Sequence, residues 1–171
     1  MNTQLDTYRF DGRTKEEFNR DQKEGHRRQE IVKKGFAKFL EQQTGVKPEV
    51  QDNGCDNSGE YLEAHQVSAE ADLVVNGQLI EVKTQFSRTF SEEIWLKKDH
   101  TDRMVRDGAH ILFAFGDFDT GDIIFTLLSN DYIKQIVKFA DVDYPAKFDY
   151  RKAVYVLSPK DMPWWKRLPI D

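Results

Sequence analysis

The chain carries three residues whose types suit the hydrolysis of a phosphodiester within one short stretch: Asp72, Glu81 and Lys83. Two carboxylates can hold a divalent cation through oxygen ligands. A lysine can stabilise the negative charge that grows on a phosphate under attack. This chemistry requires the three side chains to converge, so it depends on how the residues between them fold.

Residues 70–83 have the pattern of a β-hairpin. Two β-rich runs flank Asn76-Gly77, the dipeptide that best suits a two-residue type I′ turn. Counting outward from this turn, Asp72 faces Glu81, and alternation places Lys83 on the same side as Glu81. Directly opposed carboxylates repel, so a divalent cation between them would explain the pairing. The other face of the hairpin is apolar and comprises Leu73, Val75, Ile80 and Val82.

Two further groups belong to this candidate site. The Val82 carbonyl is a candidate third metal ligand, and Gln85, next on the face of Lys83, could hydrogen-bond a phosphate or a ligand. A plainer reading is a solvated strand face, on which Lys83 neutralises Glu70, its partner in the same register. Burial of two uncompensated carboxylates within apolar strands is costly, which favours the metal site.

The residues Ala71-Asp72 followed by Glu81-Val82-Lys83 resemble the motif of the PD-(D/E)xK nuclease superfamily, in its restriction-endonuclease-like and junction-resolvase-like members. Ala71 replaces the proline of the motif name, and Gln85 extends the motif toward a Glu-x-Lys-x-Gln variant. The resemblance covers the order of elements over about 25–128. It implies a four-stranded mixed core sheet with flanking helices and Mg²⁺-dependent hydrolysis of DNA, with Mn²⁺ as a substitute metal.

The resemblance also implies an additional acidic residue from the first helix. Glu30 is the predicted residue, because it precedes the apolar residues Ile31, Val32 and Phe36 as that family's helical glutamate precedes its apolar stripe. Glu24 competes for the role. On a helical wheel Glu30 falls away from the centre of the apolar stripe, which leaves a surface acid as the alternative.

The first part of the chain predicts a helix and then a strand. Thr14 and Glu17 have the spacing of a capping box, Gly25 is expected to break the helix, and Gly45 is expected to end it. Residues 46–61 are rich in turn formers and look like a short strand that runs into a loop.

The second part predicts another helix, which starts at Ser91-Glu92-Glu93, covers much of 94–106 and stops at Gly108. Strands are expected at 111–115 and 123–128, a short helix after Ser129, and a last strand at 153–157. An irregular, Trp-rich tail follows within 150–171. The prediction is one α/β domain over 1–171, a mixed central β-sheet flanked by helices and restriction-endonuclease-like.

The predicted helix after Ser91 carries candidate phosphate contacts. They are Lys97, Lys98, His100 and Arg103, with Arg106 nearby. A solvated helix face is the alternative. Trp164 and Trp165 could stack on bases, although indoles more often pack onto a core or a second subunit.

Composition sets wider bounds. The formal charge of −5 argues mildly against a protein that coats nucleic acid, but residues 9–38 are locally basic and could dock a polyanion. No signal peptide or membrane span is expected, and the single Cys55 is expected to be an inert thiol in a reducing compartment, so the cytoplasm is predicted. The histidines show no zinc-ligand spacing; they are His26, His65, His100 and His110.

The sequence therefore favours a metal-dependent DNA endonuclease with duplex or branched DNA as its partner. Small size and the lack of an obvious motor or threading domain favour an endonuclease over an exonuclease. A junction resolvase, a restriction or homing enzyme and a repair nuclease are not separable, RNA is not rejected as substrate, and a homodimer stays open. The rival is a non-catalytic nucleic-acid-binding or protein-interaction module that keeps the nuclease-like scaffold.

Overall fold

The computed structural model describes residues 14–53, 71–90, 92–148 and 150–171. Glu70, Cys55 and His65 lie outside these ranges. No helix among the described residues combines the length and the apolar character that crossing a membrane requires.

The centre of the fold is a six-stranded mixed sheet. Its strands, in spatial order, are β1 (Val50–Asp52), β2 (Leu73–Val75), β3 (Gln78–Phe86), β5 (His110–Asp117), β6 (Asp122–Leu128) and β9 (Lys166–Arg167). Among the described strands, β3 and β5 form the parallel pair and the other neighbours of this sheet are antiparallel. The predicted α/β class with a mixed central sheet is confirmed, although the sheet has more strands than the four implied by the resemblance.

A second, three-stranded sheet lies beside the first. It is antiparallel, in the order β4 (Ile94–Lys97), β8 (Val154–Leu157) and β7 (Asp141–Asp143). The crossover between the parallel strands β3 and β5 contains β4 and then α2 (Lys98–Asp107). The segment that leaves the end of β3 thus builds both β4 and α2.

Helix α1 (Lys15–Thr44) begins and ends where the sequence predicts. The Thr14 hydroxyl accepts a hydrogen bond from the Glu17 amide at 3.2 Å, and the Glu17 carboxylate accepts one from the Thr14 amide at 2.8 Å. Gly45 ends the helix with φ of 72°, in the left-handed region that glycine enters without steric cost.

The predicted break at Gly25 is wrong, because α1 runs through it without interruption. A glycine within a helix costs only about 1 kcal/mol relative to alanine. Ion pairs from Glu24 to Arg27 at 2.7 Å and to Arg28 at 3.0 Å span this turn of the helix. Neighbouring interactions therefore offset the weak local preference.

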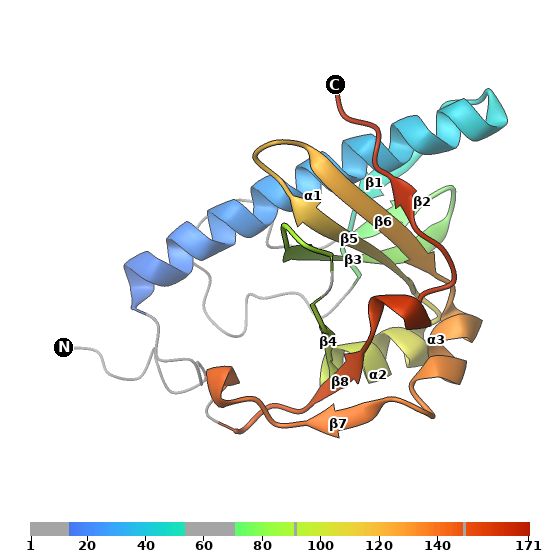
Figure 1. The fold of residues 1–171 in the computed structure, drawn as a ribbon. Helices are drawn as coiled ribbons and strands as arrows, with labels where there is room; N and C mark the ends of the chain where they lie inside the picture. The colour runs from blue at the N-terminus through green and yellow to red at the C-terminus, as the bar shows by residue number, and fades with distance from the viewer. Residues whose placement is uncertain (1–13, 54–70, 91, 149) are drawn as a thin grey trace.

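Helix α1 packs against one face of the six-stranded sheet (Figure 1). Its buried residues Val32 and Phe36 share a cluster with the apolar face of the hairpin. The cluster's hairpin members are Leu73, Val75, Ile80 and Val82. The predicted division of the hairpin into a core face and a polar face is thus observed.

The opposite face of the sheet packs against the second sheet and α3 (Asn130–Ile136). Phe113 and Phe115 of β5 lie in this second cluster, and Trp165 packs against both, with ring centroids 6.3 and 6.1 Å away. Trp164 meets Phe125 edge-on at 5.4 Å. Both tail tryptophans are therefore part of the packing, which is the second of the two roles considered for them.

The helix predicted to start at Ser91-Glu92-Glu93 starts instead at Lys98; Ser91 itself lies outside the described residues. Residues 94–97 form β4, which pairs with β8 from the far end of the chain. Ile94 and Leu96, which alternate along β4, are buried on one side of the strand. Their burial favours the strand more strongly than the local signal favours a helix start. The predicted stop at Gly108 is confirmed, with φ of 75°.

The remaining elements follow the sequence closely. The strands predicted at 111–115 and 123–128 are β5 and β6, joined by a turn, and the Ser129 hydroxyl caps α3 by accepting from the Tyr132 amide at 3.2 Å. The strand predicted at 153–157 is β8, but it is not the last, because β9 follows it in the tail.

Candidate active site

The β2–β3 hairpin has the predicted register. Leu73 pairs with Ile80 and Val75 pairs with Gln78, and Asn76 takes φ of 48° in the two-residue turn. The Lys83 ammonium forms an ion pair with the Glu81 carboxylate, so both side chains lie on one face of β3. That face is the one turned away from α1.

Asp72 continues this register beyond the last paired residue of β2, at Leu73. Its carboxylate accepts a hydrogen bond from the Val82 amide at 2.9 Å. The alternation of backbone bonds would direct that amide to the Ala71 carbonyl. The Ala71 carbonyl accepts instead from the Asn53 side-chain amide at 2.9 Å. Asp72 thus ends the ladder and is held next to the backbone of Val82.

Glu81 is the buried carboxylate of the site, with 7% of its surface exposed. Burial of a carboxylate is unfavourable unless a cation or hydrogen-bond donors compensate its charge. In the structure Lys83 supplies that compensation, and 29% of the Lys83 side chain remains exposed. The ion pair therefore has a buried acidic end and a basic end that solvent and ligands can reach.

Lys83 opens into a cleft of about 650 Å³ between β3, β4 and the 3-10 turn η3 (Ala146–Phe148). Lysines and aromatic rings from several elements line it. Its wall comprises Lys83, Thr84, Gln85, Glu92, Glu93, Trp95, Lys97, His100, Phe113, Lys147, Phe148 and Val154.

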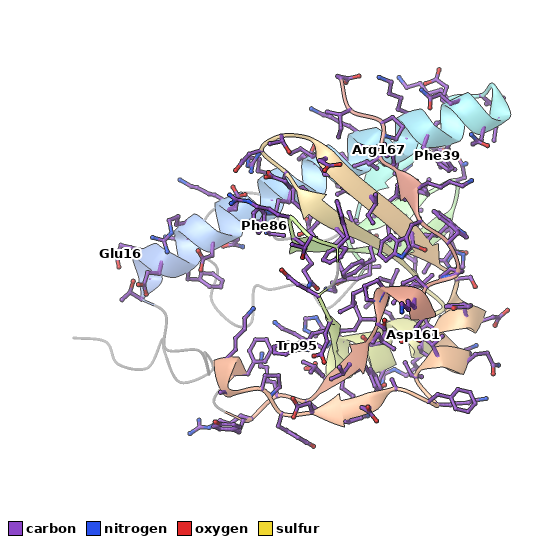
Figure 2. The ribbon with its side chains drawn as sticks, viewed as in Figure 1. Glu16, Phe39, Phe86, Trp95, Asp161 and Arg167 are labelled. Carbon is purple, nitrogen blue, oxygen red and sulfur yellow. The ribbon has the colours of Figure 1, made fainter. Side chains whose placement is uncertain are left out.

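Strand alternation on β4 explains two of these residues. Because Ile94 and Leu96 point into the core, Trp95 and Lys97 face the cleft. Gln85 connects the β3 wall of the cleft to the residue that precedes β4, because its side-chain amide donates a hydrogen bond to the Glu93 carbonyl at 3.0 Å. Figure 2 labels Trp95 at β4, the strand that carries this wall.

Burial in the wall of the cleft lowers the pKa of two basic groups, His100 and Lys97. Burial, reinforced by the charge of Lys83, lowers the pKa of His100 to about 4, so this imidazole is neutral at pH 7. Burial, reinforced by the charges of Lys152 and Lys83, lowers the pKa of Lys97 to about 8. Lys97 therefore stays mostly protonated at pH 7 but with a desolvated charge, which an incoming anion would stabilise.

The four predicted phosphate contacts divide into two groups. Lys97 and His100 line the cleft. Lys98 points elsewhere, since it pairs with Asp102 at 2.7 Å and lies over the Tyr155 ring. Arg103 is not among the residues that line the cleft, although its charge contributes to the low pKa of His100.

The predicted helical acid lies on α1, the helix on the opposite face of the sheet. Glu30 pairs with Lys33 at 2.7 Å, and Lys33 also reaches Asp52 of β1 at 3.2 Å. Its competitor Glu24 pairs with Arg27 and Arg28, and the hydrogen bond from Arg27 lowers the pKa of Glu24 to about 2. Each acid thus has its own basic partners on α1.

The donor set suits a hard divalent cation only in part. The carboxylates of Asp72 and Glu81 and the Val82 carbonyl are oxygen donors of the kind Mg²⁺ uses together with waters and substrate oxygens. Among the residues that the structure describes, no three acidic, histidine or cysteine side chains gather in a group that could hold a metal. A metal at this site would therefore be held by the two carboxylates and the Val82 carbonyl, without a third acid from α1.

Eight of the twelve residues that line the cleft were not predicted as site residues, among them Trp95, Lys147 and Phe148. The alternation of apolar residues over 94–97 was a signal for Trp95, since it is the pattern of a strand. For Lys147 and Phe148 no local signal exists, because they reach the cleft only through the pairing of β8 with β4.

Comparisons with known proteins give a distant similarity to solved structures. No protein-family model matches the chain, and no curated protein matches it. Among solved structures, the chain is similar to Hjc, a Holliday junction resolvase from the archaeal hyperthermophile Archaeoglobus fulgidus, with 12% identity and a TM-score of 0.38. The match covers 76% of this chain and 90% of that one. The similarity concerns the course of the backbone alone and gives no information on individual side chains.

Proposed function

We propose that this protein is a metal-dependent endonuclease that hydrolyses phosphodiester bonds in DNA. The observation that carries the proposal is the buried Glu81 carboxylate joined to Lys83 at the wall of a lysine-lined cleft. Asp72, held beside Val82, is the second carboxylate of the site.

Asp72 and Glu81, with the Val82 carbonyl, would hold the metal. A bound Mg²⁺ would supply Lewis-acid stabilisation of the phosphate and a water of lowered pKa. Lys83 places an ammonium at the cleft wall, where it can neutralise charge on the phosphate in the transition state. Gln85 holds the β3 and β4 walls together through its bond to Glu93, and Glu30 is proposed only as a more distant acid.

The cleft suits a polyanion in spite of the chain's net charge. Lys83, Lys97 and Lys147 all line it, and the desolvated Lys97 gains most from a phosphate partner. DNA, duplex or branched, is the proposed substrate, with Mg²⁺ as the metal and Mn²⁺ as a substitute. A cytoplasmic location and a homodimer remain predictions.

A second function deserves the same test, namely a nucleic-acid-binding or protein-interaction module without turnover. The ion pair between Glu81 and Lys83 favours it, because it compensates the buried carboxylate without any metal. Such a module would bind DNA equally well with a chelator present.

The deciding experiment incubates the purified chain with supercoiled, linear, branched and single-stranded DNA, with Mg²⁺ and separately with a chelator. The proposal predicts cleavage that requires Mg²⁺ and is abolished by Glu81→Gln. Glu41→Gln is the matched control, because Glu41 is exposed near the end of α1, outside the cleft. DNA binding without cleavage under every condition would establish the binding module instead.

A further inference from the structure

The cleft presents an accessible aromatic ring beside its charged groups. Trp95 is 39% exposed, whereas its strand neighbours Ile94 and Leu96 are buried. The Trp95 indole nitrogen donates to the Glu93 carboxylate at 3.2 Å, which fixes how the ring is presented. An indole held in this way offers a stacking surface with little conformational freedom left to lose.

Cations line another part of the same wall. The ammonium groups of Lys97 and Lys147 lie 5.2 and 5.5 Å from the centroid of the Phe148 ring. Both contacts orient the lysines through cation–π attraction, and Lys83 faces the cleft from β3. Three lysines thus line the cleft next to the proposed reaction centre.

The acids of the cleft lie at the start of the segment that carries Trp95, and Lys97 follows Trp95 at the other end of β4. Glu92 and Glu93 immediately precede β4, and Glu93 bonds Trp95. Carboxylates repel a phosphate, so an anionic ligand would direct its phosphate toward the lysines and its uncharged part toward Trp95. The arrangement selects a ligand with one anionic end and one flat, uncharged end.

The volume of the cleft further restricts the class of ligand that can fit. A volume of about 650 Å³ is in the range of pockets that enclose a small molecule. A nucleotide within a duplex keeps both faces of its base stacked on its neighbours and cannot stack on an indole. A nucleotide that has left the stack can do so.

We infer that the cleft receives one unpaired nucleotide of the nucleic-acid substrate, with its base stacked on Trp95 and its phosphate facing Lys83, Lys97 and Lys147. This inference rests on the proposed function and specifies its substrate class: strands that carry an unpaired nucleotide beside the bond to be cut. Fully paired DNA lacks the base that fills the cleft and binds more weakly.

The test measures binding with Ca²⁺ in place of Mg²⁺, so that affinity is separated from hydrolysis. Two DNA duplexes of equal length carry 2-aminopurine, one in a single-nucleotide bulge and one in a base pair. The parent protein binds the bulged duplex more tightly and quenches its fluorescence, because the base stacks on the indole. Trp95→Ala loses that preference, by roughly 5- to 100-fold, whereas Trp95→Phe keeps most of it.

The matched control is Phe139→Ala, which removes another exposed aromatic ring, 86% exposed and outside the cleft. It keeps the preference for the bulge. Equal affinity of the parent for the two duplexes, or an unchanged preference in Trp95→Ala, would overturn the inference. Cleavage is scored separately: cleavage of both duplexes without preference refutes the inference alone, and a bulge preference without cleavage refutes only the nuclease.

Discussion

Replacement of Lys83 by methionine tests whether this lysine compensates the buried carboxylate of Glu81. Methionine keeps most of the apolar stem of lysine and removes the charge. The Glu81 carboxylate, with only 9% of its side chain exposed, would then lose its cation. We expect the free energy of unfolding of the metal-free protein to fall.

The expected loss follows from the burial of the two partners. Removal of one partner from a fully buried ion pair costs about 3–5 kcal/mol. Because the Lys83 side chain is 29% exposed, solvent screens part of this interaction, and we expect about 2 kcal/mol. In a chain of this size 1 kcal/mol shifts Tm by about 2–4 °C, so Tm should fall by roughly 4–8 °C.

Thermal unfolding in the presence of a chelator measures this loss. The double variant Glu81→Gln with Lys83→Met should regain most of the lost stability, because it removes the buried charge as well. Lys134→Met is the control, since Lys134 pairs with Asp131 at 3.8 Å on the surface, and its Tm should not change measurably. A Tm of Lys83→Met within 1 °C of the parent, or a double variant no more stable than Lys83→Met, would refute the reasoning.

Three further predictions concern His100 in the lining of the cleft and two glycines of helix α1. Because burial lowers the pKa of His100 to about 4 in the folded chain, against about 6.5 when unfolded, the unfolded chain takes up this proton first as the pH falls. The free energy of unfolding of the parent should fall by up to a few kcal/mol between pH 6.5 and 4, and that of His100→Gln should fall less. Curves of Tm against pH that run parallel for the two proteins would contradict this. Gly35→Ala should lower stability by about 1–3 kcal/mol, since its Cβ would meet the Leu168 side chain at 2.5 Å. Gly25→Ala, with nothing within 4 Å, should raise it by about 0.5–1 kcal/mol, as chemical denaturation can measure.

Local signals in the sequence were sufficient to predict the hairpin and most of the helix ends. The Asn76-Gly77 turn fixes the register of β2 and β3 by itself, so the shared face of Glu81 and Lys83 was predictable from alternation. The capping box at Thr14 and the glycine stops at Gly45 and Gly108 act within one turn of helix.

Pairing between strands far apart in the sequence determined the features that local signals did not predict. Residues 94–97 become strand β4 because β8, some sixty residues later, pairs with them and buries Ile94 and Leu96. The same pairing brings Lys147 and Phe148 to the cleft, so the sequence predicted only part of the lining, namely Lys83, Gln85, Lys97 and His100. The position of Glu30 relative to the face that carries Lys83 depends on the side of the sheet that α1 covers, which the sequence leaves open.

The most direct test of the central claim compares turnover with DNA affinity for Lys83→Met, at a temperature where it is folded. If Lys83 acts at the reacting phosphate, the single-turnover rate of cleavage with Mg²⁺ falls by about a hundredfold to a thousandfold. DNA affinity, measured with Ca²⁺ to suppress hydrolysis, changes much less, because one phosphate contact among several is lost. Lys134→Met keeps both values. An unchanged single-turnover rate at saturating protein together with a collapse in affinity would contradict the account, because Lys83 would then bind DNA without taking part in its cleavage.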